Sequence, residues 1–255
     1  MPSAPDHAHP AADDHTRRAD APTVPSPGQL AAPVDAETAA EVVLPRLAVG
    51  VGVIVVLVLV LGALAQLVQG QEVNALDTGA SPYIHAFASP ILDALMNGAS
   101  TLGSVPVLLG LTAVTAAYAA WRRRPGLAGL LVVAAAGGIL LNEALKALVH
   151  RPRPRLEWAA VYPDWSFPSG HTMDSVVVLV MLAFAVWVLF GRRPGLVATA
   201  VALGLAVLIG LSRIYLGAHY LTDVIGGAVA GAIWLLVLMW AFGAAQQRQT
   251  RRRAR

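Results

Sequence analysis

The sequence predicts an all-α, polytopic membrane protein whose six transmembrane helices form a bundle. The chain of 255 residues is 56% hydrophobic and only 13% charged, whereas soluble domains carry about 25% charged residues. Long apolar runs also recur along it. The first, residues 47–68, holds 22 residues without a charge, which is enough to cross the roughly 30 Å hydrocarbon layer of a bilayer.

Residues 1–40 precede the first run and are rich in Ala, Pro, Asp and His, with no apolar period. Such a segment cannot bury a core, so we expect a disordered N-terminal tail. A short apolar segment with a cleavage site is not found, so we expect no removable signal peptide. The membrane domain is expected over residues 41–243, followed by a basic tail over residues 244–255. The absence of cysteine excludes disulfides and thiol chemistry.

The first predicted span is followed by a polar connection, residues 69–101, which contains acidic residues but no Lys or Arg. Within it we expect a short interfacial helix over residues 84–96. The remaining apolar runs predict five further spans, over residues 102–121, 127–148, 172–190, 195–211 and 224–242.

Arginine clusters set the expected orientation. They occupy residues 122–124, 192–193 and 248–255. Because basic residues gather in cytoplasmic loops, this side and both termini are predicted to be cytoplasmic. Clusters this short and scattered argue against a surface for nucleic acid. The opposite loops then lie outside, and one of them, residues 149–170, breaks the rule by carrying three arginines, which suggests a functional reason.

Lys146, the one lysine among 18 basic residues, lies near the outer end of the third span. Charged groups at membrane depth are costly and tend to mark function. The alternative is that Lys146 reaches to the interface and pairs with Glu143, three residues earlier on the helix. Arg153 follows after a proline that stops the helix. A compact ammonium and a planar guanidinium together suit a phosphate group.

The stretch from Asp164 to His171 contains a second candidate cluster. Pro168, Ser169 and Gly170 predict a tight turn, after which His171 opens a helix. A turn that leads into a helix N-terminus directs backbone N–H groups and a partial positive charge outward, which favours anions. The alternative is an ordinary helix cap by Ser169 beside a solvent-facing histidine.

The third cluster contains His219 and Asp223, which are four residues apart and share one face of a helix. The carboxylate can accept the imidazole N–H and leave the other nitrogen free as a base, nucleophile or ligand. An interfacial ion pair is the alternative. Arg213 leaves the fifth span on the same side.

The three clusters are predicted to meet. In a six-span topology the third and fifth spans end outside, while the fourth and sixth begin there, so every cluster reaches the same membrane face. Several cations beside an N–H-rich turn suit a phosphoryl group, whose transfer is catalysed mainly by positioning and positive charge.

Together the clusters resemble the three-part signature of the type 2 phosphatidic acid phosphatase superfamily, which also contains vanadate haloperoxidases and glucose-6-phosphatase-like enzymes. The matching residues are Lys146, Arg153, Pro154, Pro168, Ser169, Gly170, His171, Ser212, Arg213, His219 and Asp223. The signature covers residues 146–223, and the six-helix layout extends the likeness over residues 45–243.

The resemblance implies a two-step hydrolysis that needs neither a metal nor another cofactor. It implies that His219 is the nucleophile and forms a phosphohistidine, and that Asp223 orients it. His171 would protonate the leaving oxygen and later activate water. The implied phosphate-binding residues are Lys146, Arg153, Ser169, Gly170 and Arg213.

We therefore expect a plasma-membrane phosphatase that acts on a lipid phosphate or diphosphate, similar to phosphatidic acid or a prenyl diphosphate, at an outward-facing site. The alternatives are a phosphatase of a soluble ester, a haloperoxidase, a non-catalytic anion or proton-coupled transporter, and a metal site built from His171, His219 and Asp223. The sequence leaves open the identity of the lipid substrate and the oligomeric state of the protein.

Overall fold

A computed structural model describes residues 36–69 and 75–253, and every regular element within them is a helix. The helices are α1 (Ala36–Gln69), α2 (Ala75–His85), α3 (Pro90–Leu102), α4 (Val105–Trp121), α5 (Pro125–Val149), α6 (Gly170–Phe190), α7 (Arg192–Tyr215) and α8 (Leu221–Arg253). The predicted all-α membrane architecture is thereby confirmed.

Five of these helices are long and apolar enough to cross a membrane by themselves, namely α1 (from Val49), α5, α6, α7 and α8 (to Ala244). The helices α3 and α4, which meet at a bend of 54°, make a sixth candidate span if the pair is counted as one. The predicted second span, residues 102–121, therefore corresponds to α4, and α3 extends it at an angle.

The predicted interfacial helix over residues 84–96 is instead divided between α2 and α3. The division falls at Ser89 and Pro90, because Pro90 is suited to the first position of a helix and Ser89 caps it, accepting a hydrogen bond from the Leu92 N–H at 3.3 Å. At the chain ends, α1 begins at Ala36, inside the predicted tail, whose residues 1–35 lie outside the described part. The helix α8 continues through most of the predicted basic tail.

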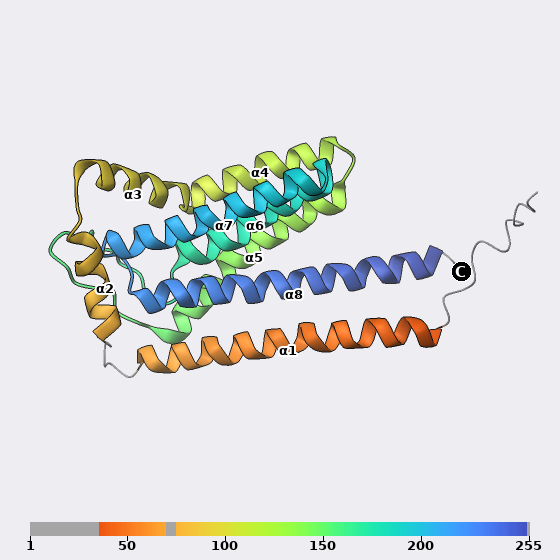
Figure 1. The fold of residues 1–255 in the computed structure, drawn as a ribbon, viewed down its shortest axis with the longest axis horizontal. Coiled ribbons are helices and arrows are strands. Elements are labelled where there is room, and N and C mark those ends of the chain that lie inside the picture. The colour runs from red at the N-terminus through yellow and green to blue at the C-terminus, as the bar shows by residue number, and fades with distance from the viewer. Residues whose placement is uncertain (1–35, 70–74, 254–255) are drawn as a thin grey trace, which may run out of the picture. The chain divides into compact units, whose positions relative to one another are not determined.

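The centre of the bundle is α6, which packs against α4, α5, α7 and α8 (Figure 1). Its inner face contributes Val177 and Met181 to the main apolar core. Small residues allow the helices to approach closely, as is common in membranes. For example, the Trp234 ring of α8 lies over Gly137 of α5 and its Nε1 donates to the Ala134 carbonyl at 2.9 Å.

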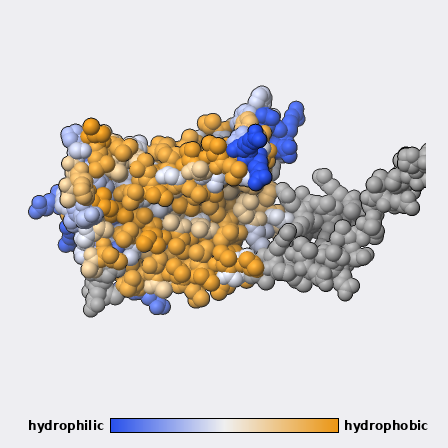
Figure 2. Space-filling model, in the orientation of Figure 1, coloured by the Kyte–Doolittle hydropathy of each residue, from blue (hydrophilic) through white to orange (hydrophobic). Residues whose placement is uncertain are grey.

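Apolar side chains also cover the outside of the helices. On the face drawn in Figure 2, hydrophobic residues extend along the helices and hydrophilic residues gather toward their ends. Val114, Leu140 and Val207 are 62–71% exposed, as expected of residues that face lipid rather than water.

One end of the bundle gathers the segments that the sequence singled out. The helix α5 stops at His150, which has a left-handed backbone (φ 53°) and is followed by Pro152 and Pro154. The loop over residues 150–169 then leads to α6. The helix α2 packs against α7 and α8 at this end, where Ser81 donates to the Ile214 carbonyl at 2.6 Å.

Candidate active site

The ends of α5, α6 and α7 and the loops beside them enclose a cavity of about 180 Å³. Six of the eight predicted site residues line it: Lys146, Arg153, Gly170, His171, Arg213 and His219. The two others, Ser169 and Asp223, are fully buried behind its wall. The structure therefore brings all three sequence clusters to one place, as the parity of the spans predicts.

His219 lies at the buried side of this cavity and is only 1% exposed. Its Nε2 is 3.0 Å from Nη1 of Arg153. Because a guanidinium can only donate, Nε2 accepts this hydrogen bond and carries no proton. The other nitrogen, Nδ1, faces Asp223 Oδ2 at 3.5 Å, without a hydrogen bond. Complete burial lowers the pKa of His219 to about 4, although the Asp223 carboxylate acts in the opposite direction. The side chain is thus a neutral imidazole whose Nε2 lone pair accepts from Arg153, and both residues line the cavity.

Asp223 is held by a set of buried groups that we call the inner charge network: Asp77, Arg151, Ser166, Thr222 and Asp223. Arg151 donates to Asp223 Oδ1 at 2.5 Å and to Asp77 Oδ2 at 2.7 Å. Ser166 Oγ and the Tyr220 N–H donate to Asp223 Oδ2. Both oxygens of Asp223 are therefore engaged, which fixes the carboxylate beside His219.

Asp77 closes the inner charge network from α2. It accepts hydrogen bonds from the N–H of Thr222 at 3.0 Å and from its hydroxyl at 2.7 Å, so it also satisfies backbone at the start of α8. The Arg151 guanidinium lies over the Tyr220 ring at 4.0 Å. All charges in this network are at most 5% exposed.

A second group of charges, Lys146, Arg153 and Asp164, lies at the cavity wall and is called here the outer charge network. Lys146 Nζ is 2.6 Å from Asp164 Oδ2 and 3.3 Å from Glu143 Oε1. The pairing with Glu143 expected as an alternative is thus present, but the contact with Asp164 is shorter. Arg153 Nη2 contacts both oxygens of Asp164, at 2.8 and 2.9 Å.

The Asp164 carboxylate is 41% exposed. Its partial burial acts to raise the pKa of Asp164, but the hydrogen bonds and charges of Lys146 and Arg153 outweigh that effect and hold the pKa below its ordinary value. Asp164 is therefore an anion bound to the two cations that the sequence assigns to phosphate.

The turn before α6 is tied to the start of α8, because the Ser169 N–H donates to the Asp223 carbonyl at 3.0 Å. Ser169 does not cap α6 with its side chain; its hydroxyl accepts from Thr172 Oγ1 at 3.1 Å. At Gly170 a Cβ would lie 3.0 Å from Asn142 Oδ1. A larger residue at this position would press on α5, so the glycine lets the turn lie against that helix.

Arg213 is 3% exposed and donates to Ser100 of α3. Tyr162 lies between the two guanidinium groups, with its ring centre 5.5 Å from Arg213 and 4.6 Å from Arg153. His171 lines the central cavity and a neighbouring one of about 270 Å³, which Asn97, Ser100 and Ser104 border where α3 and α4 meet.

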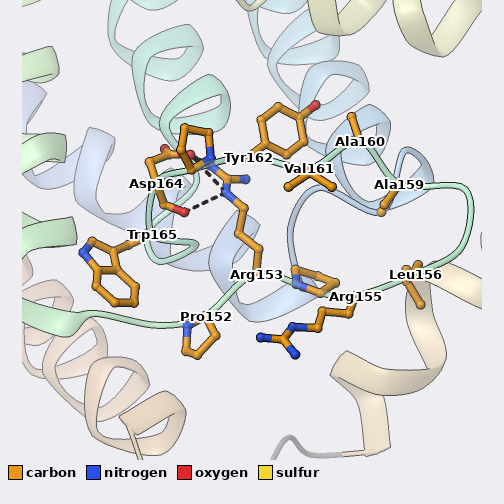
Figure 3. Close-up of a pocket in the computed structure, with 13 residues that line it drawn as sticks. Pro152, Arg153, Arg155, Leu156, Ala159, Ala160, Val161, Tyr162, Asp164 and Trp165 are labelled. Carbon is orange, nitrogen blue, oxygen red and sulfur yellow. Dashed lines mark hydrogen bonds and ion pairs between the residues drawn. The ribbon is translucent and has the colours of Figure 1, made fainter.

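A larger cavity, of about 610 Å³, opens on the other side of Arg153 (Figure 3). The loop over residues 152–165 encloses it together with Gly217. Arg153, Tyr162 and Asp164 line both this outer cavity and the central one. Figure 3 shows Arg153 and Asp164 joined, with Tyr162 beside them.

Sequence reasoning missed Asp77, Asp164 and Ser166 as parts of the site. Asp164 stands at the start of the stretch that was singled out, and Asp77 lies in a connection that carries acids but no bases, so weak signals were present. Among the described residues, no group of three His, Cys, Asp or Glu side chains is placed to hold a metal ion. This includes the alternative set of His171, His219 and Asp223.

Comparison with known proteins gives a consistent result. The family model described as the PAP2 superfamily matches residues 126–247. Phosphatidylglycerophosphatase B of Bacillus subtilis is 30% identical over 172 residues, which cover 67% of this chain and 85% of that protein. A putative undecaprenyl-diphosphatase of Escherichia coli is 40% identical over 73 residues, 29% of this chain and 33% of that protein.

A solved structure agrees with these sequence matches. The crystal structure of a transmembrane PAP2-type phosphatidylglycerolphosphate phosphatase from Bacillus subtilis is similar at a TM-score of 0.68 and 28% identity, covering 76% of this chain and 96% of that one. The apolar helices and the match to phosphatidylglycerophosphatase B at 30% identity agree with the family model. The chain therefore belongs to the PAP2 superfamily, as a multi-pass membrane phosphatase that hydrolyses phosphoric monoesters or diphosphates.

Proposed function

We propose that this protein hydrolyses the terminal phosphate of a membrane lipid through a phosphohistidine intermediate on His219. The observation that carries the proposal is the unprotonated Nε2 of His219, which accepts from Arg153 at the lining of a cavity of about 180 Å³ that Lys146 and Arg213 also line. Nε2 becomes free to attack when Arg153 turns to the phosphate. A site of this size suits a phosphate group, and its fixed cations would stabilise the charge on three equatorial oxygens.

In the first step Nε2 of His219 attacks phosphorus, and the bond from phosphorus to the lipid oxygen breaks. Asp223 stabilises the imidazolium that forms, and His171 gives a proton to the leaving oxygen. In the second step His171 takes a proton from water, whose oxygen attacks phosphorus and breaks the bond to Nε2. The phosphate is held by Lys146, Arg153, Arg213, Ser169 and the Gly170 backbone.

The place of His171 supports its role as the acid. It borders both the central cavity and the 270 Å³ cavity beside the bend between α3 and α4. If the phosphate of a lipid occupies the central cavity, the rest of the lipid would depart through the second cavity. His171 would then lie at the bond that breaks. Because the relative that matches over 172 residues is a phosphatidylglycerophosphatase, phosphatidylglycerol phosphate is the first substrate to test, ahead of phosphatidic acid and prenyl diphosphates.

His219→Ala in purified protein tests the mechanism. Phosphate release from the lipid panel should fall by at least about 1,000-fold, since loss of a catalytic nucleophile removes the covalent path. His150→Ala, in the loop between α5 and α6 and outside the central cavity, is the control histidine and should keep most of the activity. An active His219→Ala protein would refute the phosphohistidine, and loss of wild-type activity in excess chelator would favour a metal-dependent reaction.

We further propose that the site faces outward and that both termini are cytoplasmic, from the arginine clusters at residues 122–124 and 192–193. The chain has no cysteine, so single cysteines can report each face. Val161→Cys, at a loop position that is 97% exposed, should react with an impermeant maleimide in intact cells. Arg123→Cys should react only after permeabilisation, and the reverse pattern would invert the topology.

A further inference from the structure

The Asp164 carboxylate lies where a phosphate would be expected to bind. Its oxygens accept hydrogen bonds from Lys146 Nζ at 2.6 Å and from Arg153 Nε and Nη2 at 3.2 Å or less. Paired carboxylate oxygens and paired phosphate oxygens present the same geometry to a guanidinium. In this state the two cations are occupied by an anion that belongs to the chain itself.

This contact can open. Asp164 is 41% exposed, whereas Asp223 is fully buried, and it belongs to a loop rather than a helix. Asp164 also lies between the central and the outer cavity and lines both of them. Its side chain has space to move toward the outer cavity and leave the cations to another anion.

Charge then decides which anion can take its place. A terminal phosphate carries a charge of about −1.5 to −2 near neutral pH, whereas a phosphodiester carries −1. A diester that displaces Asp164 exchanges one single negative charge for another, so the cations gain little. A terminal phosphate brings additional charge and further acceptor oxygens, and Arg213, which also lines the cavity, can use them.

We propose that Asp164 is a specificity-determining residue: it competes for Lys146 and Arg153, so that doubly charged terminal phosphates bind and singly charged phosphodiesters are excluded. This inference rests on the proposed function and concerns the same site. It matters in a bilayer because phosphodiester head groups of ordinary phospholipids surround the site and would otherwise occupy it.

The test compares wild-type protein with Asp164→Asn in detergent micelles at pH 8. Inhibition of lipid phosphate hydrolysis is measured with inorganic phosphate and with dihexanoyl phosphatidylglycerol, a phosphodiester. Asp164→Asn should strengthen inhibition by the diester by about tenfold or more, the factor expected when a hydrogen-bonded charge no longer competes. Inhibition by inorganic phosphate should change less, so the ratio of the two inhibition constants should shift toward the diester.

Two further variants sharpen the comparison. Asp164→Glu keeps the carboxylate and should retain discrimination closer to wild type. Glu157→Gln removes an exposed carboxylate from the same loop, outside both cavities, and should leave the ratio unchanged. If Asp164→Asn instead weakens inhibition by both anions equally, Asp164 positions Lys146 and Arg153 and does not compete, and the proposal falls.

The outcome can be separated from that of the proposed function. If wild-type protein hydrolysed no lipid phosphate, the proposed function would fail. Discrimination could still be measured as protection against thermal unfolding by inorganic phosphate and by dimethyl phosphate. Equal protection of wild type by the two probes, with no change in Asp164→Asn, would overturn the role of Asp164 by itself.

Discussion

The inner and outer charge networks both pair an arginine with aspartate, but they differ in their exposure to water. In the inner one, Arg151 joins Asp77 and Asp223, and all three side chains are at most 5% exposed. In the outer one, Lys146 and Arg153 join Asp164, which is 41% exposed. His219 lies between them, with Nδ1 toward the inner network and Nε2 toward the outer one.

This difference in burial separates two tasks. A buried charge must keep its partners, because a lost partner leaves an uncompensated charge in a poorly solvated place. The inner network is therefore suited to fixing Asp223 behind His219. A partly exposed pair can exchange its partner for water or a ligand at small cost. The outer network is suited to a site that must bind and release an anion in every turnover.

The largest effect is expected from breaking the inner network. Arg151→Ala should lower the free energy of unfolding by about 3–5 kcal/mol, because Asp77 and Asp223 lose their shared cation while buried. Unfolding in detergent, followed by heat or denaturant, measures the loss.

Arg155→Ala is the matched control for Arg151→Ala. Arg155 is an exposed arginine on the same loop, and its removal should change stability by no more than about 0.5 kcal/mol. If the two variants were equally stable, the inner network would contribute no more than a surface charge, and the contrast between the networks would be lost.

A small effect is expected from the outer network. Asp164→Asn should lower the free energy of unfolding by about 1 kcal/mol or less at neutral pH, since the pair is partly exposed and screened. The pKa of Asp164 is lowered in the folded state, so its stabilising contribution is present above the unfolded-state pKa and is lost as the pH falls through the lowered folded-state pKa.

The stability curves of wild type and Asp164→Asn should therefore converge in acid and separate toward neutral pH. Denaturant titrations from about pH 3 to pH 7 would follow this difference. A difference that grows on acidification would mean that the carboxylate is strained rather than stabilised by Lys146 and Arg153, which would contradict the role assigned to it.

Much of the fold and the grouping of the site follow from one-dimensional signals. Hydrophobic length predicts the spans, and their parity places Lys146, His171 and His219 at one end of the bundle. The bend between α3 and α4 was not predicted, because the hydropathy of residues 90–121 records composition and not direction. Ser89 and Pro90 form a recognisable helix-start signal, but the predicted interfacial helix over residues 84–96 includes both of them.

The partners of the site residues were harder to predict. Asp77 meets Arg151 across 74 positions of sequence, and no local periodicity connects them. Asp164 meets Lys146 because an irregular loop folds back over α5, and the path of such a loop depends on tertiary contacts. Ser169 also has a partner that the motif does not reveal, since its hydroxyl accepts from Thr172 Oγ1. Motifs thus predict which residues form the site, whereas tertiary packing determines which other side chains contact them.

Gly227 of α8 has a consequence for how the reaction distance is maintained. A Cβ at this position would lie 2.6 Å from the Ser169 carbonyl oxygen and 3.3 Å from the Met173 nitrogen, so even one methyl group would push α8 away from the turn. Asp223 stands one turn earlier on α8. Catalytic groups must hold their geometry to within about 0.5 Å. The spacing between the proposed nucleophile and the turn before α6 therefore depends on a residue that takes no part in bond making, because only the hydrogen of Gly227 fits between the two segments.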